Sequence, residues 1–592
     1  MYINLNPFKN IHPINTSKNL NPQKRSYTSS ESRMNEGYIF LPNSLTNSMT
    51  KYQVSFCSIN STINKIAEKS TPIKELSDAE FQKMLPEVES KLKELGISLP
   101  KLNKNNILFT NKFVSDENLI TNKNLRLWIK SVISDITTPE QAEVANKFFS
   151  HERLYGNEYT ILGDSDIIKS TKTPESAQAK ISIMDKYLSD ESLFENKSIK
   201  RKILDIIHGV KTLEQAEAKL SLIDKYISLN DSYYSDNLEN VIGSIILKVN
   251  TTDQLLVADK YISNACLYNN EYLVHAIEDI IASIRTSKTA QAKISVMDKY
   301  VSDKKLYYAH NTYTNIGDII SQTATSEQAE IATKYLSDER LYENKNFNNW
   351  IRGIISDNLT REQANAKISI IDKYLMDKNL YENKILKEKM GEFVYWIQTP
   401  EQVELAYKYL SDERLYDNIN LSNNINSIII QIQTPKDLNT KTSIINKYLS
   451  DKNLYENKHI SNIIGDIIES AETPEKAEMA IKVLSNEKLC QNKLIVNNII
   501  RIIKTAKSFD EFNLIIKMLE YISDKKLYKN SNISETLGTI ISSAKTSEQT
   551  KIKLSLLENF ITDEKLQKNN TLKENIGDKF CRINTRLKTI YN

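Results

Sequence analysis

The six histidines are the residues best suited to acid–base or metal chemistry, but they share no sequence pattern. A metal centre or a general base requires a histidine in a fixed arrangement with further histidines, cysteines or carboxylates. The six instead fall at unrelated positions of the repeat described below: His12, His151, His208, His275, His310 and His459. We therefore expect no metal site, no catalytic histidine and no cofactor.

The recurring carboxylates have a structural explanation. They belong to a repeated Ser-Asp-Glu sequence, in which Asp338 and Glu339, for example, lie in the first turn of a capped segment and interact favourably with its dipole. The chain contains no phosphate-binding glycine loop, no nucleophile elbow and no zinc-protease motif. We expect a protein that is not an enzyme, and we assign no catalytic residue.

The four cysteines indicate a reducing compartment. Cys57, Cys266, Cys490 and Cys581 lie at least 91 residues apart, which is neither a disulfide framework nor a zinc-ligand spacing. No apolar segment approaches the roughly 18 residues that a membrane helix needs. The N-terminus lacks the basic and then apolar pattern of a secretory signal. We expect a cytoplasmic protein with no membrane segment.

The first 101 residues differ in composition from the rest. Residues 1–70 are rich in Asn, Ser and Thr and carry eight Lys and Arg against three Glu, without helical periodicity, which predicts disorder. Their acid-poor, serine-rich composition leaves a targeting or secretion signal as an alternative to a cytoplasmic location. Residues 71–101 are expected to form an N-terminal cap with one helix, which begins at the capping box Ser77–Glu80 and ends at Leu95-Gly96.

A repeated block dominates the remaining chain. The sequence Lys-Tyr-Leu-Ser-Asp-Glu-x-Leu-Tyr recurs, mostly at alternating steps of 35 and 39 residues, around a residue that we call the anchor. The thirteen anchors are Phe113, Phe148, Tyr187, Tyr226, Tyr261, Tyr300, Tyr335, Tyr374, Tyr409, Tyr448, Val483, Tyr521 and Phe560. The residue 25 positions after each anchor is Thr or Ser in all thirteen units. Four extra residues are about one helical turn, so the longer units extend a helix without rotating its apolar face far.

Each of these Thr or Ser residues is predicted to cap a helix, which we call helix A. Eight are followed three residues later by Gln or Glu, as in a capping box, and five by proline in the first helical position. After helix A, Ser337 is expected to cap a short turn in its unit, with Leu336 and Leu341 packed as a hydrophobic staple.

A second helix, helix B, completes each unit. Its core is expected to be an Ile pair preceded by a bulky residue, as in Trp350, Ile354 and Ile355. Glycine inside a helix costs about 1 kcal/mol relative to alanine. A recurring glycine in helix B therefore predicts a close approach of neighbouring helices. The glycines that occupy or closely match this position are Gly243, Gly317, Gly465, Gly538 and Gly577.

Neither helix of a unit can bury its apolar side alone, whereas stacked units bury it continuously. The sequence therefore predicts an all-α fold, a right-handed α/α superhelical solenoid of about thirteen helix pairs over residues 102–592. The pattern resembles the class of tetratricopeptide, HEAT and armadillo-like superhelices. The tetratricopeptide signature residues are absent and the 35/39 alternation matches none of these families, so no family residue is carried over.

Eighteen of the 30 tyrosines recur at two positions, the anchor and the position seven residues later. Regular aromatic residues stack bases in some RNA-reading repeat proteins. A residue that recurs in every unit is more simply explained by a core gap that recurs in every unit, and we favour core packing. Residues 102–592 also carry 65 Lys and Arg against 66 Asp and Glu, without the basic excess typical of RNA-binding repeats.

These patterns favour a non-enzymatic scaffold that binds a protein or peptide along an extended solenoid surface. The contacts are expected from exposed positions that vary between units, rather than from the recurring Tyr, Ile and Leu positions. An RNA-binding helical-repeat protein is the alternative. A host-directed effector, or an enzyme that uses the N-terminal segment, is a further alternative.

Overall fold

The computed structural model describes residues 76–157, 163–229, 236–356 and 359–524, except positions 99, 492 and 507, together with scattered residues between 548 and 575. They belong to one compact unit, Glu75–Asn592. Every regular element in this part of the chain is an α-helix, which confirms the all-helical fold class. The predicted tract 1–70 lies outside the described residues.

The first helix, α2 (Asp78–Glu94), has the two ends that the sequence predicts. The side chain of Ser77 accepts a hydrogen bond from the backbone N–H of Glu80, and the Glu80 carboxylate accepts one from the N–H of Ser77 at 2.9 Å. After Leu95, Gly96 has φ of 70°, in the left-handed region that favours glycine at the end of a helix.

Helix A occurs in two lengths. The first units contain α3 (Ile107–Ser115) and α6 (Pro139–Phe148), and the other short helices have 11 residues: α14 (Thr252–Ile262), α20 (Ser326–Leu336), α26 (Pro400–Leu410) and α33 (Pro474–Leu484). The long helices have 16: α9 (Pro174–Ser189), α12 (Leu213–Ser228), α17 (Ser287–Ser302), α23 (Arg361–Met376), α29 (Pro435–Ser450) and α36 (Phe509–Asp524). The 11-residue helices end at a Leu or Ile one residue after the anchor, and most of the 16-residue helices continue one residue further. The two helix lengths therefore differ by five residues rather than the predicted four.

The predicted caps of helix A are confirmed in every described unit. The hydroxyl of the Thr or Ser 25 residues after the anchor accepts a hydrogen bond from the N–H three residues later, from Thr138 through Ser508. Thr546 and Thr585 lie outside the described residues.

A short helix follows helix A, and its cap differs from the prediction. These helices are α4 (Glu117–Thr121), α7 (Glu152–Tyr155), α10 (Glu191–Glu195), α15 (Ala265–Tyr268), α18 (Lys304–Tyr308), α21 (Glu339–Tyr342), α24 (Lys378–Glu382), α27 (Glu413–Tyr416), α30 (Lys452–Tyr455), α34 (Glu487–Cys490) and α39 (Glu564–Lys568). The backbone of Ser337 is still helical, with φ of −87°, whereas Asp338 is extended and accepts the hydrogen bond from the N–H of Arg340. Asp338, not Ser337, is therefore the cap of α21.

Helix B begins in most units at an asparagine, a residue to which the sequence analysis assigned no role. Oδ1 of Asn196, for example, accepts a hydrogen bond from the N–H of Ile199 at 2.9 Å. The B helices are α5 (Lys123–Asp135), α8 (Gly163–Lys169), α11 (Lys197–Gly209), α13 (Asp236–Lys248), α16 (Glu271–Ala282), α19 (His310–Gln322), α22 (Lys345–Ser356), α25 (Lys384–Trp396), α28 (Ile419–Ile430), α32 (Ile464–Ser470) with α31 (Lys458–Ser461) before it, and α35 (Lys493–Thr505).

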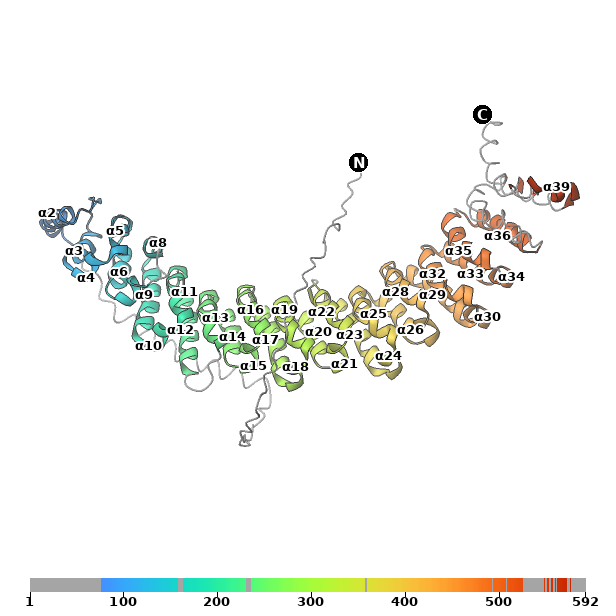
Figure 1. Cartoon of the computed structure of the whole chain (residues 1–592), viewed down its shortest axis with the longest axis horizontal. Helices are drawn as coiled ribbons and strands as arrows, with labels where there is room; N and C mark the ends of the chain where they lie inside the picture. The colour runs from blue at the N-terminus through green and yellow to red at the C-terminus, as the bar shows by residue number, and fades with distance from the viewer. Residues whose placement is uncertain are drawn as a thin grey trace, which may run out of the picture. The chain divides into compact units, whose positions relative to one another are not determined.

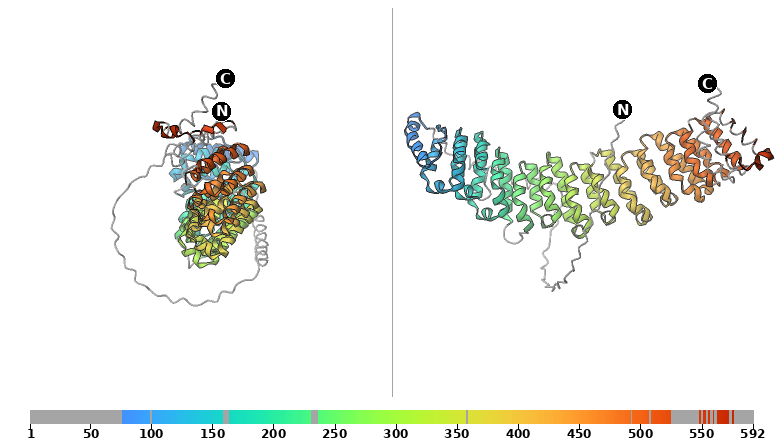
Figure 2. Two further views of the ribbon diagram at one scale, coloured as in Figure 1. Left: turned by 90° about the vertical axis from the view of Figure 1, so that its right-hand side faces the viewer. Right: turned by 45° about the horizontal axis from the view of Figure 1, so that its top comes forward.

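The A helices pack on A helices of neighbouring units, and the B helices pack on B helices, so that the two sets form two layers in chain order (Figure 1). The second view of Figure 2 shows the same succession from another side. The anchors from Phe113 to Val483 are buried, and Tyr521 is partly buried. Core packing of the anchors is therefore confirmed in these units. The count of thirteen units stays a prediction, because the last units extend beyond the described residues.

A buried polar position connects the two layers. The residue seven positions before the anchor is lysine in five long helices, Lys180, Lys219, Lys293, Lys367 and Lys441, and its ammonium donates to carbonyls near the end of the following B helix. Carbonyls in the last turn of a helix have no partner within the helix and carry partial negative charge, so an ammonium is a suitable donor.

In α6, α14, α20 and α26 the same position is the third helical residue and is glutamine, whereas in α33 it is Lys476, which pairs with Glu472 at 3.0 Å. Oε1 of Gln402 accepts hydrogen bonds from the N–H groups of Gln398 and Thr399 at the cap, while Nε2 donates to the carbonyls of Ile429 and Ile432 in the B-layer. The side-chain amide of Gln402 thus forms hydrogen bonds with backbone groups both at the start of helix A and at the end of helix B. In long helices the position lies one turn farther from the cap, where lysine serves helix B alone.

The glycine position in helix B brings two backbones together, as predicted. A Cβ atom on Gly391 of α25 would lie 2.7 Å from the carbonyl oxygen of Asn346 and 2.7 Å from Cα of Phe347, both in α22. The N–H of Gly391 also donates to Oδ1 of Asn346 at 2.8 Å. Gly243 and Gly465 make the equivalent approach to α11 and α28.

Replacing Gly391 by alanine is expected to destabilise the protein by about 1–3 kcal/mol, because the two backbones must move apart. Gly209→Ala is the matched control, since nothing lies within 4 Å of a Cβ at the end of α11. Thermal unfolding followed by circular dichroism should show a lower midpoint for the first variant only. Equal midpoints would contradict the close packing of α22 and α25.

The buried lysines predict a stability that rises with pH. Burial lowers the pKa of Lys219 to about 7 and that of Lys293 to about 8, below the ordinary lysine value of 10.5. Between the two values the unfolded chain binds a proton that the folded protein does not. The unfolding free energy should therefore rise from about pH 7 to about pH 9, below the range in which ordinary tyrosines titrate.

Urea unfolding at several pH values tests this expectation. Lys219→Met should flatten the rise, and it should lower stability by about 1–3 kcal/mol because the carbonyls of Ile246, Leu247 and Val249 lose their donor. Lys304→Met, at an exposed position in α18, should change neither quantity. A flat profile for the wild-type protein would show that the carbonyls keep the buried ammonium groups charged.

Candidate interaction surface

The side chains that could bind a metal ion do not gather in one place among the described residues. No group of three His, Cys, Asp or Glu side chains among them could hold a metal ion. His275 has Glu271 and Asp279 one turn away on either side of α16, a spacing that the sequence analysis overlooked, but all three residues are exposed on a single helix. His12 lies outside the described residues, and the other four histidines are exposed or partly buried.

The two cysteines among the described residues differ in burial. Cys490 is buried in α34, and burial raises the pKa of its thiol to about 12, so its thiolate is not available as a nucleophile at neutral pH. Cys266 is partly buried and free. None of the helices in the described part of the chain combines the length and the apolar character that a membrane crossing requires.

The second recurring tyrosine position, seven residues after the anchor, is also largely used in packing. Tyr342 and Tyr416 are buried, whereas Tyr381 and Tyr455 are partly exposed. The two partly exposed rings are covered by guanidinium groups of the preceding unit, with Arg340 lying 4.5 Å from the centre of the Tyr381 ring. Equivalent stacking joins Arg414 to Tyr455 at 4.7 Å. These rings contribute to contacts between units.

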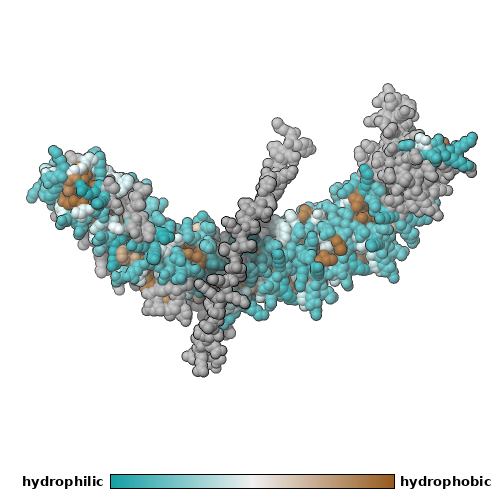
Figure 3. Space-filling model, viewed as in Figure 1, coloured by the Kyte–Doolittle hydropathy of each residue, from teal (hydrophilic) through white to brown (hydrophobic). Residues whose placement is uncertain are grey.

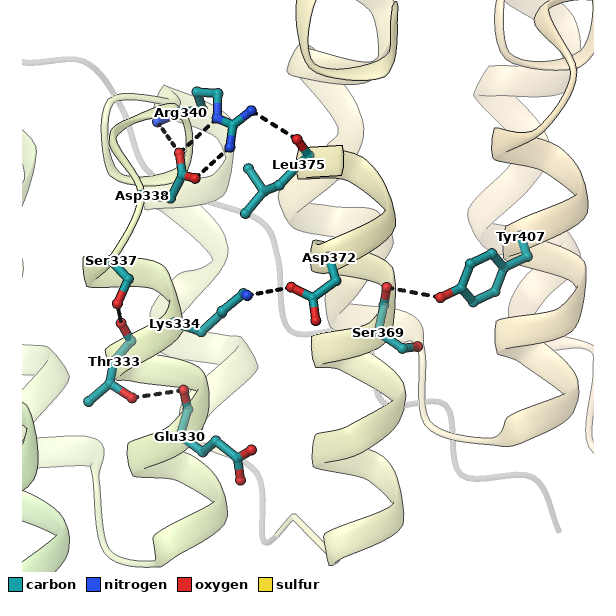
Figure 4. Close-up of polar contacts among 10 residues, drawn as sticks. All are labelled: Glu330, Thr333, Lys334, Ser337, Asp338, Arg340, Ser369, Asp372, Leu375 and Tyr407. Carbon is teal, nitrogen blue, oxygen red and sulfur yellow. Dashed lines mark hydrogen bonds and ion pairs between the residues drawn. The ribbon is translucent and has the colours of Figure 1, made fainter. Parts of the chain in front are cut away.

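Charged residues of the A-layer pair with one another between successive helices. Figure 4 shows Lys334 of α20 paired with Asp372 of α23, and Arg340 bound both to Asp338 and to the carbonyl of Leu375 at 2.9 Å. The same lysine–aspartate pairing occurs in four further positions: Lys147–Asp185, Lys186–Asp224, Lys225–Asp259 and Lys260–Asp298. The recurring charges of helix A are therefore largely used within the stack.

The outward side of the B helices is different, because its residues vary between units. We call the residues of the B helices that are not buried the B face. The position 15 residues after the anchor belongs to it, and in the described units it contains Trp128, Lys202, Val241, Ala276, Asn315, Trp350, Lys389, Asn424, Ile463 and Asn498. Trp128 is exposed and the other nine are partly exposed, so this variable position can contribute to a partner contact, whereas the buried positions cannot.

All three tryptophans of the chain lie on B helices, and none is buried. Trp128 in α5 is 45% exposed, and Trp350 in α22 and Trp396 in α25 are partly exposed. Trp396 lies seven residues beyond position 15 of its own unit, two helical turns along the same side. Trp350 is thus not the core residue that the sequence analysis assigned. The buried residue is Ile351, which holds the same position in α22 as Ile316 does in α19, and Trp350 packs partly buried against the core.

Trp350 and Trp396 are joined by a third aromatic ring. The ring centre of Tyr395 lies 5.1 Å from that of Trp350 and 4.8 Å from that of Trp396. A Cβ atom on Gly353 would lie 3.2 Å from the Tyr395 ring, so the glycine leaves room for that ring to cross from α25 to α22. We call Trp350, Gly353, Tyr395 and Trp396 the aromatic patch.

Apolar residues elsewhere on the surface are scattered. Figure 3 shows that the visible face of the described residues is mostly hydrophilic, with small separate hydrophobic patches. Tyr272 and Ile430, on B helices, are 43% and 39% exposed, and Tyr308 and Met376, outside them, are 84% and 83% exposed. The aromatic patch differs from these single residues because three rings from two helices are in contact.

The charge of the B helices changes sign along the chain. α5 and α11 carry seven Lys and Arg against two Asp. α13, α16 and α19 carry six Asp and Glu against one Lys. α22 and α25 carry five Lys and Arg against two Glu. At the junction between the last two groups, Arg352 of α22 binds Asp318 of α19 at 2.8 Å.

Comparisons of the chain with protein-family models, with curated proteins and with solved structures find no match. The functional argument therefore depends on the geometry and chemistry of the B face.

Proposed function

We propose that the chain is an α/α solenoid that binds a protein or peptide partner on its B face and performs no catalysis. The placement of Trp128, Trp350 and Trp396 carries this proposal. Tryptophan is enriched at protein–protein interfaces and dominates their binding energy, whereas an unpartnered exposed tryptophan leaves a large apolar area in water. Their position on the variable side of the B-layer supports a surface used for recognition.

The solenoid part of the proposal is supported by the packing of A on A and B on B helices in successive units. In a solenoid each unit contacts only its neighbours, so whole units can be removed without loss of folding. This property distinguishes a stack of repeats from a globular helical domain.

Deleting residues 286–359 removes two units and joins Arg285 to Thr360, which caps a long helix just as Thr286 does. The shortened protein is expected to stay helical and to unfold cooperatively in circular dichroism. Deleting only residues 286–305 should break the register of the stack and abolish cooperative unfolding. Identical behaviour of the two deletions would contradict the repeat architecture.

The binding part can be tested with a double variant of the full chain, Trp350→Ala with Trp396→Ala. The control is Tyr308→Ala with Met376→Ala, which removes two side chains that are more exposed than the tryptophans and lie outside the B helices. Pull-downs from native lysate, with and without nuclease, are read by mass spectrometry and RNA recovery. We expect one protein partner that survives nuclease, binds the control variant and is lost, at least tenfold, from the tryptophan variant.

Two outcomes would contradict the proposal. Recovery that disappears with nuclease would favour the RNA-binding alternative. A partner retained equally by both variants would place the interaction away from the aromatic patch. Thermal unfolding of each variant confirms that the comparison is made on folded protein.

A further inference from the structure

The charges next to the aromatic patch restrict the chemistry of its partner. This inference rests on the proposed function, since it takes the B face to be the binding surface. The two helices that supply the rings also supply Lys345 and Arg352 on α22 and Lys384, Lys387 and Lys389 on α25. Lys345, Arg352, Lys384 and Lys387 are exposed. An apolar surface bordered by cations is complementary to an apolar side chain flanked by carboxylates.

A groove next to the aromatic patch extends the same surface toward the start of the two helices. Its walls include Asn346 and Asn349 of α22 and the ring of Tyr381, with the cations of Arg340, Lys345 and Lys387 interspersed with the carboxylates of Glu343, Glu382 and Glu388. Asn349 precedes Trp350, so the groove and the aromatic patch are neighbours on α22. Amide groups and lysine in the groove offer donors to carboxylates and backbone carbonyls of a bound chain.

The neighbouring acidic helices distinguish a protein segment from a nucleic acid. A polyanion that followed the B face beyond α22 would meet six carboxylates on α13, α16 and α19. Repulsion there opposes a nucleic acid, whose charge is negative along its whole length. A protein segment can change sign where the surface does.

We propose that the partner presents a segment with two charge clusters of opposite sign. An aromatic or aliphatic side chain lies on the aromatic patch, with Asp or Glu beside it, opposite the lysines of α22 and α25. Lys or Arg residues of the same segment face α13, α16 and α19. The Arg352–Asp318 pair marks the boundary between the two halves.

The spacing of the helices gives the separation of the two clusters. Packed helices lie about 9–10 Å apart. From α16, the middle of the acidic helices, to the midpoint of α22 and α25 is therefore about 24 Å. An extended chain advances about 3.3 Å per residue, so about seven residues separate the cluster of carboxylates from the cluster of cations.

Selection from a displayed library of random 16-residue peptides tests the inference on the full chain. Clones are selected on the wild-type protein and then depleted on the variant with Trp350→Ala and Trp396→Ala. We expect enriched peptides that combine an aromatic or aliphatic residue with Asp or Glu, followed or preceded by Lys or Arg about seven residues away.

Synthetic copies of the enriched peptides are then titrated by fluorescence anisotropy. Lys345→Glu with Lys387→Glu should weaken binding at least tenfold, and a peptide with its carboxylates replaced by lysines should recover it. Lys304→Glu with Lys452→Glu, at exposed positions in α18 and α30, is the matched control and should bind as the wild-type protein does.

The possible failures are distinguishable. Enriched peptides with cations beside the apolar residue, or peptides insensitive to Lys345→Glu with Lys387→Glu, would overturn the inference and leave the proposed function standing. Peptides that bind the tryptophan variant as well as the wild-type protein, or no enrichment at all, would overturn both.

Discussion

The carbonyl groups at the buried ends of the B helices are the constraint on which this architecture depends. Each end lies against helix A, out of water, and an unpaired carbonyl there costs about 1–3 kcal/mol. Lysine or glutamine seven positions before the anchor removes that cost with a donor from the other layer. Lysine occupies this position in five of the six 16-residue helices and glutamine in α6, α14, α20 and α26, whereas α33 has Lys476 and α36 has Leu514.

The residues that bind these backbone carbonyls recur from unit to unit, whereas other residues of each unit vary. Anchors, caps and the lysine–aspartate pairs of helix A recur because each unit must make the same contacts with the next. The unburied residues of helix B make contacts that differ between units, such as Arg352–Asp318 and Asn315–Asn348, and their residue types differ accordingly. The B face holds the three tryptophans and the contact between Gly353 and the Tyr395 ring. The change in the sign of charge along the chain also occurs on the B helices.

The features that sequence reasoning found are the local ones. The capping threonines, the end of α2 at Gly96 and the glycine approach in helix B depend on neighbouring residues or on a recurring pattern. The features that it missed depend on distant contacts. Lys293 reads as a surface residue until the carbonyl of Ile320 is placed against it, and the ring contact between Trp350 and Tyr395 appears only when α25 is placed against α22. The composition of residues 102–592 does not reveal the acidic and basic groups of B helices, because the numbers of Lys and Arg and of Asp and Glu are nearly equal.

The glycine contacts also divide the stack mechanically. Gly391 and Gly465 bring their helix backbone directly against the backbone of the preceding B helix. Because few side-chain atoms separate the two backbones, we expect little rearrangement at these contacts. The pairs α22 with α25 and α28 with α32 should therefore be stiff. No such glycine lies between α19 and α22, where side chains and the Arg352–Asp318 pair make the contact. We expect bending to concentrate at such joints, one every two units, so the boundary between the acidic and basic halves of the B face is also a flexible joint.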